Sequence, residues 1–411
     1  MRAHLTNNGY ALSAKFPMTV FEMQDALDKL KYPTGNRNVT FRIYEFRNMD
    51  MPSELWKRNF SADIYKLNLF AERIEKLNNM EMTAFKSLLT TNPDSDFDDM
   101  LLMTYGLDCV PVWPCSDLAE LGEAMIENDM VEELNELPDE LIDLIDREKI
   151  GRLCQEREHG VFVDGYYCVP SSYEPPDINI EIGEPERCFF RLLIAPAPIN
   201  DESTEQFAQW LSLPCEKENL NDIAKDLGID RIHDMVYYDF QSLLPTICDE
   251  NFGDMHRIDE LNDLAQRLSE LSNYDFVKLK AVMESEKIHD ISDTLDCIEH
   301  LSEYEFDMVV SDESEFGRTY LSKNLPTNFD NSILDKMDLY DFSEKILERT
   351  GGKITSYGAI SGRGQELYSS ITVQQEQTQA EENTEDICED FSEEEPEEDE
   401  SENFEMGGMS M

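Results

Sequence analysis

The sequence has few basic residues for its length. Its 411 residues include 34 Lys and Arg against 89 Asp and Glu, so the net charge at pH 7 is −55. Binding to nucleic acid through phosphates requires a high density of Lys and Arg, and this composition excludes it. The same excess of negative charge opposes binding to an anionic membrane surface. A basic partner is the natural complement, and solubility in high salt is the alternative explanation.

Cysteine pairs and long apolar runs are also missing. The nine cysteines are scattered and contain no C-x-x-C, and the N-terminal "MRAHLTNNGY" does not resemble a secretory signal. We therefore expect reduced thiols in a cytoplasm. The six histidines show no zinc-ligand spacing relative to the cysteines, and no apolar run approaches the 18 residues of a membrane span.

The sequence contains none of the common catalytic motifs. It has no phosphate-binding loop, no G-x-S-x-G and no H-E-x-x-H. "SGRGQE" at 361–366 contains glycine but follows no convincing strand, and paired carboxylates are too frequent for any pair to be singled out. We expect a protein that is not an enzyme and that needs no cofactor or metal.

The stretch "TNPDSDFDD" (91–99) places four aspartates within six positions. Asp94, Asp96 and Asp98 match positions one, three and five of an EF-hand loop, but Asp99 and Tyr105 stand where that loop needs Gly and Glu. The spacing therefore argues against a calcium site. One or two aspartates are explained as helix caps, and the rest are available to present charge to a partner.

An internal repeat is visible at an offset of 194 residues. Residues 65–89 align with 259–283, and seven identical pairs carry the match: Leu67/Leu261, Asn68/Asn262, Ala71/Ala265, Arg73/Arg267, Leu77/Leu271, Asn79/Asn273 and Lys86/Lys280. Downstream the register slips by one, so that Asp117, Glu120 and Gly122 meet Asp312, Glu315 and Gly317. Two copies of about 165 residues follow, joined by a Pro-rich segment at 169–187.

Each copy reads as α+β. In the first copy, the pattern predicts strands at 2–6 and 38–46, helices at 19–30, at 63–90 (broken near Asn78), at 118–125 and after Pro138, and one closing strand at 160–168. Thr19 and Glu22 form a capping-box sequence at the first helix. His159 is expected to cap a helix end rather than to act in catalysis.

Acidic residues are concentrated between Glu127 and Glu148, where ten of 22 residues are Asp or Glu. Read as a helix, with about 1.5 Å rise per residue, this stretch would carry about one negative charge per 3.3 Å. One strand of B-form DNA carries one phosphate per about 3.4 Å. A solvated acidic face gives a similar count, and the acidity of both copies favours imitation of DNA.

The C-terminus differs from the rest of the chain. Residues 371–411 hold 16 acids and no Lys or Arg, so residues 1–370 still carry −39 of the −55. The composition predicts a disordered acidic tail. The folded part is therefore extremely acidic without it.

The sequence resembles the ArdA antirestriction proteins. The resembling segments are "LN-LA-RL-EL" (Leu67 to Leu77 and Leu261 to Leu271), "DFDDMLLMTYGLDCV", "DLAELG" and "REKIGRLCQEREHGVFVDGYY". The second copy departs from the pattern at "SDTLDCIEHL" and "TGGKITSYG". The resemblance implies an elongated DNA mimic, built here as a tandem repeat of two modules, each with small α/β and helical subdomains.

The resemblance further implies occupation of the DNA-binding groove of a type I restriction–modification enzyme, through its methyltransferase core. The expected domains are module one at 1–168, the linker at 169–187, module two at 188–366 and the tail at 367–411. The expected phosphate-mimic acids are Asp94, Asp98, Asp99, Glu127, Asp129, Glu132, Glu133, Glu136, Asp139, Glu140, Asp143, Asp146, Asp293, Asp312, Glu313 and Glu315.

Two alternatives stay open from the sequence. An acidic chaperone or scaffold would bind a basic partner chiefly through the tail. A DNA mimic could instead inhibit another defence enzyme, such as a CRISPR effector. Either a homodimer or an intrachain pseudo-dimer of the two copies is compatible with the repeat.

Overall fold

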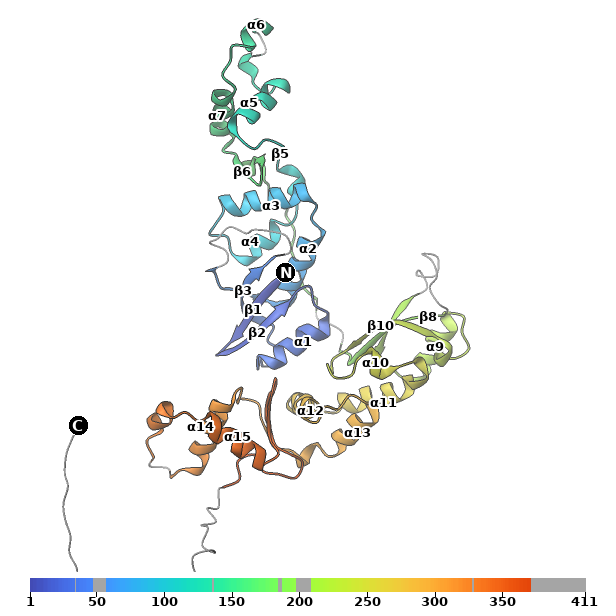
Figure 1. The fold of residues 1–411 in the computed structure, drawn as a ribbon. Helices are drawn as coiled ribbons and strands as arrows, with labels where there is room; N and C mark the ends of the chain where they lie inside the picture. Colours follow the sequence, from blue (N-terminus) through green and yellow to red (C-terminus); the bar gives the residue numbers. More distant parts are fainter. Residues whose placement is uncertain are drawn as a thin grey trace, which may run out of the picture. The chain divides into compact units, whose positions relative to one another are not determined.

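The computed structural model describes residues 1–33, 35–46, 57–134, 137–183, 187–196, 208–326 and 329–370. Residues Met1–Tyr368 belong to one unit, and its architecture is mixed α and β with small sheets (Figure 1). Four clusters of buried apolar side chains organise this unit, two in each half of the sequence.

The first half begins with a four-stranded antiparallel sheet in the order β2-β1-β3-β4. Its strands alternate buried and exposed residues, as expected where one face covers a core: Leu5 of β1 pairs with Phe41 of β3, which pairs with Phe60 of β4. The elements around this first core are β1 (Arg2–Asn7), β2 (Tyr10–Lys15), α1 (Val20–Lys29), β3 (Asn38–Glu45), β4 (Phe60–Asp63), α2 (Ile64–Lys76), α3 (Asn79–Thr91) and α4 (Phe97–Leu102).

Local capping sets the helix boundaries in this part. Thr19 and Glu22 form the predicted capping box of α1, and Asn78 with Glu81 forms another that separates α2 from α3. The apolar stripe of α2 is core, since Leu67, Phe70 and Ala71 are fully buried. The predicted capping box at Thr19 and Glu22 and the predicted break near Asn78 are both confirmed.

The first half ends in a small subdomain with its own core around Leu121, Met125 and Tyr167. Its elements are β5 (Val112–Trp113), α5 (Leu118–Glu127), α6 (Asp139–Ile142), α7 (Arg147–Glu158), β6 (Val161–Val163) and β7 (Tyr166–Cys168). A Cβ on Gly122 would lie 1.9 Å from the carbonyl oxygen of Arg147, and one on Gly151 would lie 1.9 Å from that of Leu118. These two glycines allow α5 and α7 to pack backbone against backbone.

The elements of the second half follow largely the same order along the chain as those of the first half. They are β8 (Phe190–Ala195), β9 (Gln209–Leu213), α9 (Lys217–Asp226), β10 (Val236–Ser242), α10 (Asp249–Phe252), α11 (Ile258–Ser269), α12 (Asn273–Glu286), α13 (Ile291–Glu299), β11 (Phe306–Asp307), α14 (Glu313–Asn324), α15 (Tyr340–Arg349), β12 (Lys353–Thr355) and β13 (Gly358–Ile360). Short 3₁₀ helices connect them and their counterparts: Leu107–Cys109, Glu132–Leu134, Pro170–Ser172, Ile232–Asp234, Met255–Arg257, Leu301–Glu303 and Asn331–Lys336.

Equivalent residues make equivalent contacts in the two halves. Asn68 on α2 accepts a hydrogen bond from the backbone N–H of Met18 (2.6 Å), and Asn262 on α11 accepts one from that of Cys215 (2.8 Å). The small sheets also share one order, β5-β7-β6 and β11-β13-β12. Buried polar side chains must find partners, which explains why this asparagine recurs.

Several expectations from the sequence are corrected. The single closing strand at 160–168 is a hairpin, β6–β7, which turns at Asp164 and Gly165, and the second half repeats it as β12–β13. Strands β2 and β4 were not predicted. Tyr173 and Ile180 of the expected linker pack against the first core, so part of 169–187 belongs to the first half. Leu367 is fully buried, and the ordered unit reaches Tyr368, beyond the expected boundary at 366.

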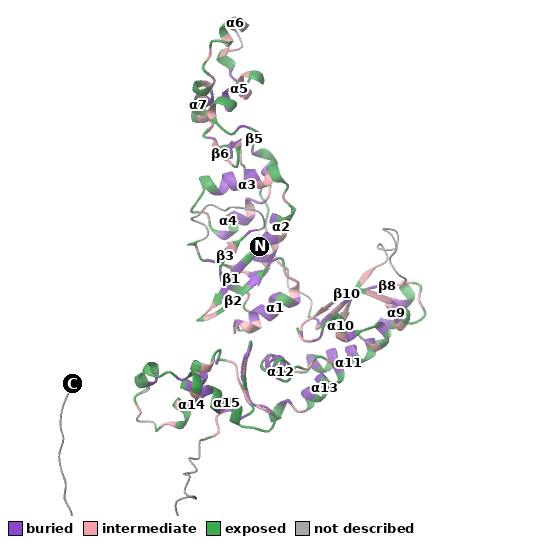
Figure 2. Cartoon of the chain, viewed as in Figure 1, coloured by how far each residue is buried: buried purple, intermediate pink, exposed green. Residues whose placement is uncertain are grey.

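Within the part of the chain that the structure describes, no helix combines the length and apolarity that a membrane crossing requires. Figure 2 shows exposed residues along α5 and α7, around the small core of the first half. Residues 371–411, where the sequence predicts an acidic tail, lie outside the described residues.

Candidate interaction surface

The aspartates at 94–99 surround the start of α4. Asp96 is its N-cap, and the carboxylate accepts a hydrogen bond from the N–H of Asp99 at 2.9 Å. Asp290 caps α13 in the same way, accepting from the N–H of Ser292 at 2.8 Å. Hydrogen bonds from the hydroxyl (2.7 Å) and the N–H of Ser292, together with Arg257, hold the pKa of Asp290 below its usual value. The expectation that one or two aspartates of the 91–99 stretch cap a helix is confirmed at Asp96, and Asp290, its counterpart at the repeat offset of 194, caps a helix as well.

The other three aspartates of this stretch are exposed but not equivalent. Asp98 forms an ion pair with Lys66, whose Nζ lies 2.8 Å from Oδ1 and 2.9 Å from Oδ2. Among the described residues, Asp94 and Asp99 have no ion-pair partner. Local compensation therefore weakens Asp98 as a candidate for presenting charge, and Asp94 and Asp99 keep that role.

The acidic stretch from Glu127 to Glu148 is not the helix assumed for the charge-spacing comparison. Helix α5 ends at Glu127, a 3₁₀ turn occupies Glu132–Leu134, α6 has a single turn, and α7 starts at Arg147. Asp129 has a positive φ of 56°, which breaks the helix two residues after α5 ends. The helical rise of about 1.5 Å per residue therefore does not set the charge spacing here. The value of about 3.3 Å per charge, which assumed one helix, does not apply to this stretch.

The acids of this stretch differ in their local partners. Glu127, Asp129, Glu132 and Asp143 are exposed and have no ion-pair partner among the described residues. A hydrogen bond from Arg157 lowers the pKa of Glu133, and a hydrogen bond from Lys149 lowers that of Asp146. Both carboxylates stay ionised at neutral pH, but part of their charge is compensated.

Three predicted acids of this stretch carry less structural information. Glu136 lies outside the described residues. The backbone of Asp139 and Glu140 forms the start of α6, and their side chains are outside the described part. They stay candidates on sequence grounds alone.

The predicted acids of the second half have mostly structural contacts. Asp312 caps α14 by accepting from the N–H of Glu315 (2.8 Å), and Glu315 accepts from the N–H (2.9 Å) and Oγ (2.8 Å) of Ser311. Glu313 is half-buried, and Asp293 is exposed in the first turn of α13. The same caps occur in the first half at Asp117 and Glu120, so helix capping explains why these acids match between the copies.

Exposed apolar side chains interrupt the acids of the first half. Leu144 is 80% exposed, and Met130, Leu137 and Leu141 are also exposed. Leu141 and Leu144 stand at apolar positions of the helix predicted after Pro138. The structure corrects this, because α6 has one turn and leaves both side chains outside the small core.

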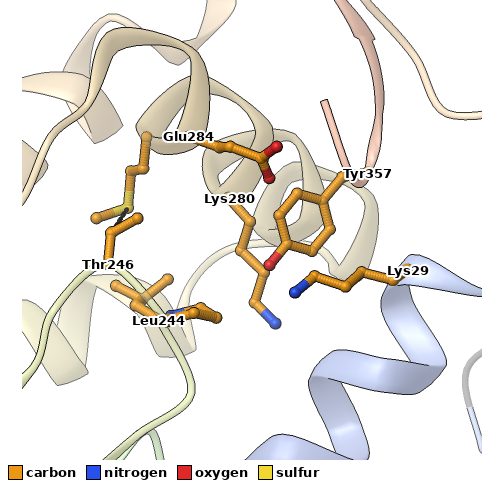
Figure 3. Close-up of a pocket in the computed structure, with 8 residues that line it drawn as sticks. Lys29, Leu244, Thr246, Lys280, Glu284 and Tyr357 are labelled. Carbon is orange, nitrogen blue, oxygen red and sulfur yellow. Dashed lines mark hydrogen bonds between the residues drawn. The ribbon is translucent and has the colours of Figure 1, made fainter. Parts of the chain in front are cut away.

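A buried charge cluster joins the two halves, and Figure 3 shows three of its side chains, Lys280, Tyr357 and Lys29, close to one another. Lys280 of α12 donates to Asp25 Oδ1 (2.9 Å) and Asp28 Oδ2 (2.8 Å), both on α1. Tyr357, from the turn between β12 and β13, donates to Asp25 at 2.6 Å, and Lys29 lies 2.7 Å from the same carboxylate. The side chain of Lys280 is 1% exposed, so this ion pair is almost fully removed from water.

Burial and charge act in opposite directions on these groups. Burial alone would raise the pKa of Asp25, but Lys280 and Lys29 outweigh it and hold the pKa below its usual value. Burial alone would lower the pKa of Lys280, and the two aspartates raise it. Burial, reinforced by Asp25, raises the pKa of Tyr357, which stays a neutral donor.

Sequence reasoning missed this cluster, although one signal was present. Lys86 and Lys280 are identical in the repeat, and each is buried beside buried apolar residues of its own helix. Lys86 pairs with Asp164, which lies in the turn of the β6–β7 hairpin of the same half. The corresponding turn in the second half holds Ser356 and Tyr357, and Lys280 finds its carboxylates on α1 instead. A lysine repeated at a core position was the clue.

The described residues contain no group of three or more His, Cys, Asp or Glu that could hold a metal ion. No family model matches the chain. A comparison with curated proteins finds no significant match either.

Proposed function

We propose that this protein is an acidic DNA mimic that blocks a type I restriction–modification enzyme by occupying its DNA-binding groove. One observation carries the proposal: residues 1–370 hold a net charge of −39, and Glu127, Asp129, Glu132 and Asp143 are exposed there without an ion-pair partner among the described residues. The resemblance to ArdA supplies the target class. Stated more finely, the chain is a tandem repeat of two ArdA-like modules.

The physical basis is the replacement of phosphates by carboxylates. A DNA-binding groove contacts phosphates through Lys and Arg, and these contacts set position and affinity with little dependence on base identity. Side-chain carboxylates on an ordered surface can occupy such sites. Because ordered elements present the acids, the mimic needs no contribution from residues 371–411, whereas a chaperone or scaffold would depend on them.

Competition binding tests the proposal directly. The purified methyltransferase core of a type I enzyme is mixed with its labelled target duplex, and the protein is titrated in. We expect full, competitive displacement of the duplex. The protein concentration at half displacement should fall as the duplex concentration is lowered, in the ratio that simple competition requires. The protein alone should not shift the duplex at moderate salt.

Three results would change the conclusion. Tight binding of the duplex by the protein alone would contradict mimicry. Displacement of DNA from a CRISPR effector, with none from the type I core, would keep mimicry and change the target. A noncompetitive effect that disappears with the tail would favour the chaperone or scaffold function.

A further inference from the structure

We propose that Met130, Leu137, Leu141 and Leu144 form an apolar anchor that binds a protein surface combining Lys and Arg with exposed apolar side chains. The proposal rests on the proposed function, because it describes the partner surface more closely. A purely electrostatic mimic needs no such residues. The anchor would add affinity that DNA itself cannot have.

The exposure of these side chains is unusual as a group. Single exposed leucines are common on protein surfaces. Here Leu144 is 80% exposed, Met130 53%, Leu141 47% and Leu137 38%, all within 15 residues. Each of the four directly follows an acid in the sequence: Asp129, Glu136, Glu140 and Asp143. An apolar set rimmed by charge is typical of a protein-binding surface.

The structure ties both ends of this segment to the small core. At its start, Val131 is buried and Leu134 packs against the core of Leu121 and Met125. At its end, the guanidinium of Arg147 donates to the carbonyl of Ile142 (2.9 Å) and to Glu123 on α5 (2.6 Å). The anchor is therefore presented between two fixed points, which lowers the entropy lost on binding.

Charge decides among the possible occupants. Between Glu127 and Glu148 the chain has ten acids and one basic residue, Arg147. A second copy of the chain would bring two such surfaces together, and like charges at an interface are costly. The same repulsion disfavours nucleic acid and anionic lipid. A basic protein surface with apolar side chains satisfies both the acids and the leucines.

The two contributions respond differently to salt. Ion contacts to a basic groove weaken as salt rises, in proportion to their number. Burial of apolar area does not depend on counterion release. Removing the leucines should therefore lower affinity by the same factor at every salt concentration, about tenfold or more for each side chain that becomes fully buried.

The test compares the double variant Leu141→Ser/Leu144→Ser with Glu132→Gln/Asp143→Asn. Affinity for the type I methyltransferase core is measured over a series of salt concentrations. The leucine variant should lose at least about 30-fold with an unchanged salt slope, and the acid variant should lose affinity with a shallower slope. Met80→Ser on α3, which removes a side chain 44% exposed outside the segment, is the matched control and should bind as wild type.

A second arm keeps the anchor testable if the type I core is not the target. Two peptides of equal positive charge are used as probes, one built of Lys and Leu and the other of Lys and Ser. Wild type and Met80→Ser should bind the Lys–Leu peptide more tightly, and the leucine variant should bind the two peptides equally. Absence of core binding by wild type would count against the proposed function only.

Two outcomes overturn the anchor. One is equal binding of the two peptides by wild type. The other is a leucine variant that loses affinity only together with its salt slope, since the loss would then come from displaced acids. Because both leucines are exposed, the variant should keep the wild-type circular dichroism spectrum and melting temperature.

Discussion

Lys280 Nζ lies 2.9 Å from Asp25 Oδ1, although 255 residues separate the two in the sequence. Asp28 Oδ2 accepts a second hydrogen bond from the same ammonium group at 2.8 Å. The contact connects α12 of the second half with α1 of the first, and Tyr357 completes it. A paired charge of this kind contributes little net stability when intact, but its loss leaves uncompensated charge behind.

Replacement of Lys280 by Met should therefore destabilise the protein strongly. It leaves Asp25 and Asp28 buried with Lys29 as the main compensating charge. We expect a loss of about 3–5 kcal/mol in the free energy of unfolding, measured by urea denaturation. Lys66→Met, which removes the half-buried partner of the exposed Asp98, is the matched control and should cost at most about 1 kcal/mol. Equal losses in both variants would contradict the role of the buried cluster.

The Asp25 contact should also fail in acid. Its pKa is depressed in the folded state below its usual value, so the stabilisation is fully present above the unfolded pKa and is lost as pH falls through the folded value. The difference in unfolding free energy between wild type and Asp25→Asn should stay constant from about pH 7 to pH 5 and shrink below about pH 4. A difference that already shrinks between pH 7 and pH 6 would be incompatible with this linkage.

Local sequence signals predicted those helix boundaries that are set by residues close together in the sequence. The capping box at Thr19 and the break at Asn78 place helix boundaries without tertiary information. The pattern at 160–168 predicts one strand, whereas the structure has a hairpin there. The Asp164–Gly165 dipeptide at its turn is a strong hairpin signal. The helix predicted after Pro138 fails because α6 ends after one turn, and no periodicity in the sequence marks that end.

The candidate site was only partly predictable. A count of acids finds the charged stretches but cannot separate a cap such as Asp312 from an exposed charge such as Asp143, because that depends on which N–H groups are near. The partner of Lys280 could not be found from spacing, since Asp25 belongs to the other half of the chain. The resemblance to ArdA, the DNA mimicry and the enzyme it would block stay predictions.

The chain is expected to be a monomer. The face of α1 that carries Asp25 and Asp28 is covered by the second half of the same chain, through Lys280 and Tyr357. Light scattering at dilute concentration should give a mass near 47.6 kDa. A stable species of twice that mass would favour the homodimer.

Removal of the acidic C-terminus should leave most inhibition intact if the cut follows Ser370. The tail's charge should raise the association rate more than the affinity, an effect that salt suppresses. A chain ending at Glu366 should have a lower melting temperature. It lacks Leu367, which is buried, and Tyr368, whose hydroxyl donates to Asp307 at 2.7 Å. Thermal melting of the two truncations should separate them. Complete loss of inhibition in the Ser370 chain, with its fold retained, would favour the chaperone or scaffold function.

The central claim is that an array of acids, and no single carboxylate, blocks the target. Inhibition of type I restriction is measured as Glu127, Asp129, Glu132 and Asp143 are changed to Gln or Asn one by one and together, at two salt concentrations. Exposed ion pairs are each worth about 0–1 kcal/mol, so each single change should weaken inhibition less than about tenfold, and losses should accumulate and shrink in high salt. Neutralising four tail residues, Glu393, Glu394, Glu395 and Glu397, removes the same charge and should have little effect. A graded loss confined to the first set is predicted; a near-complete loss from one substitution, insensitive to salt, would contradict mimicry.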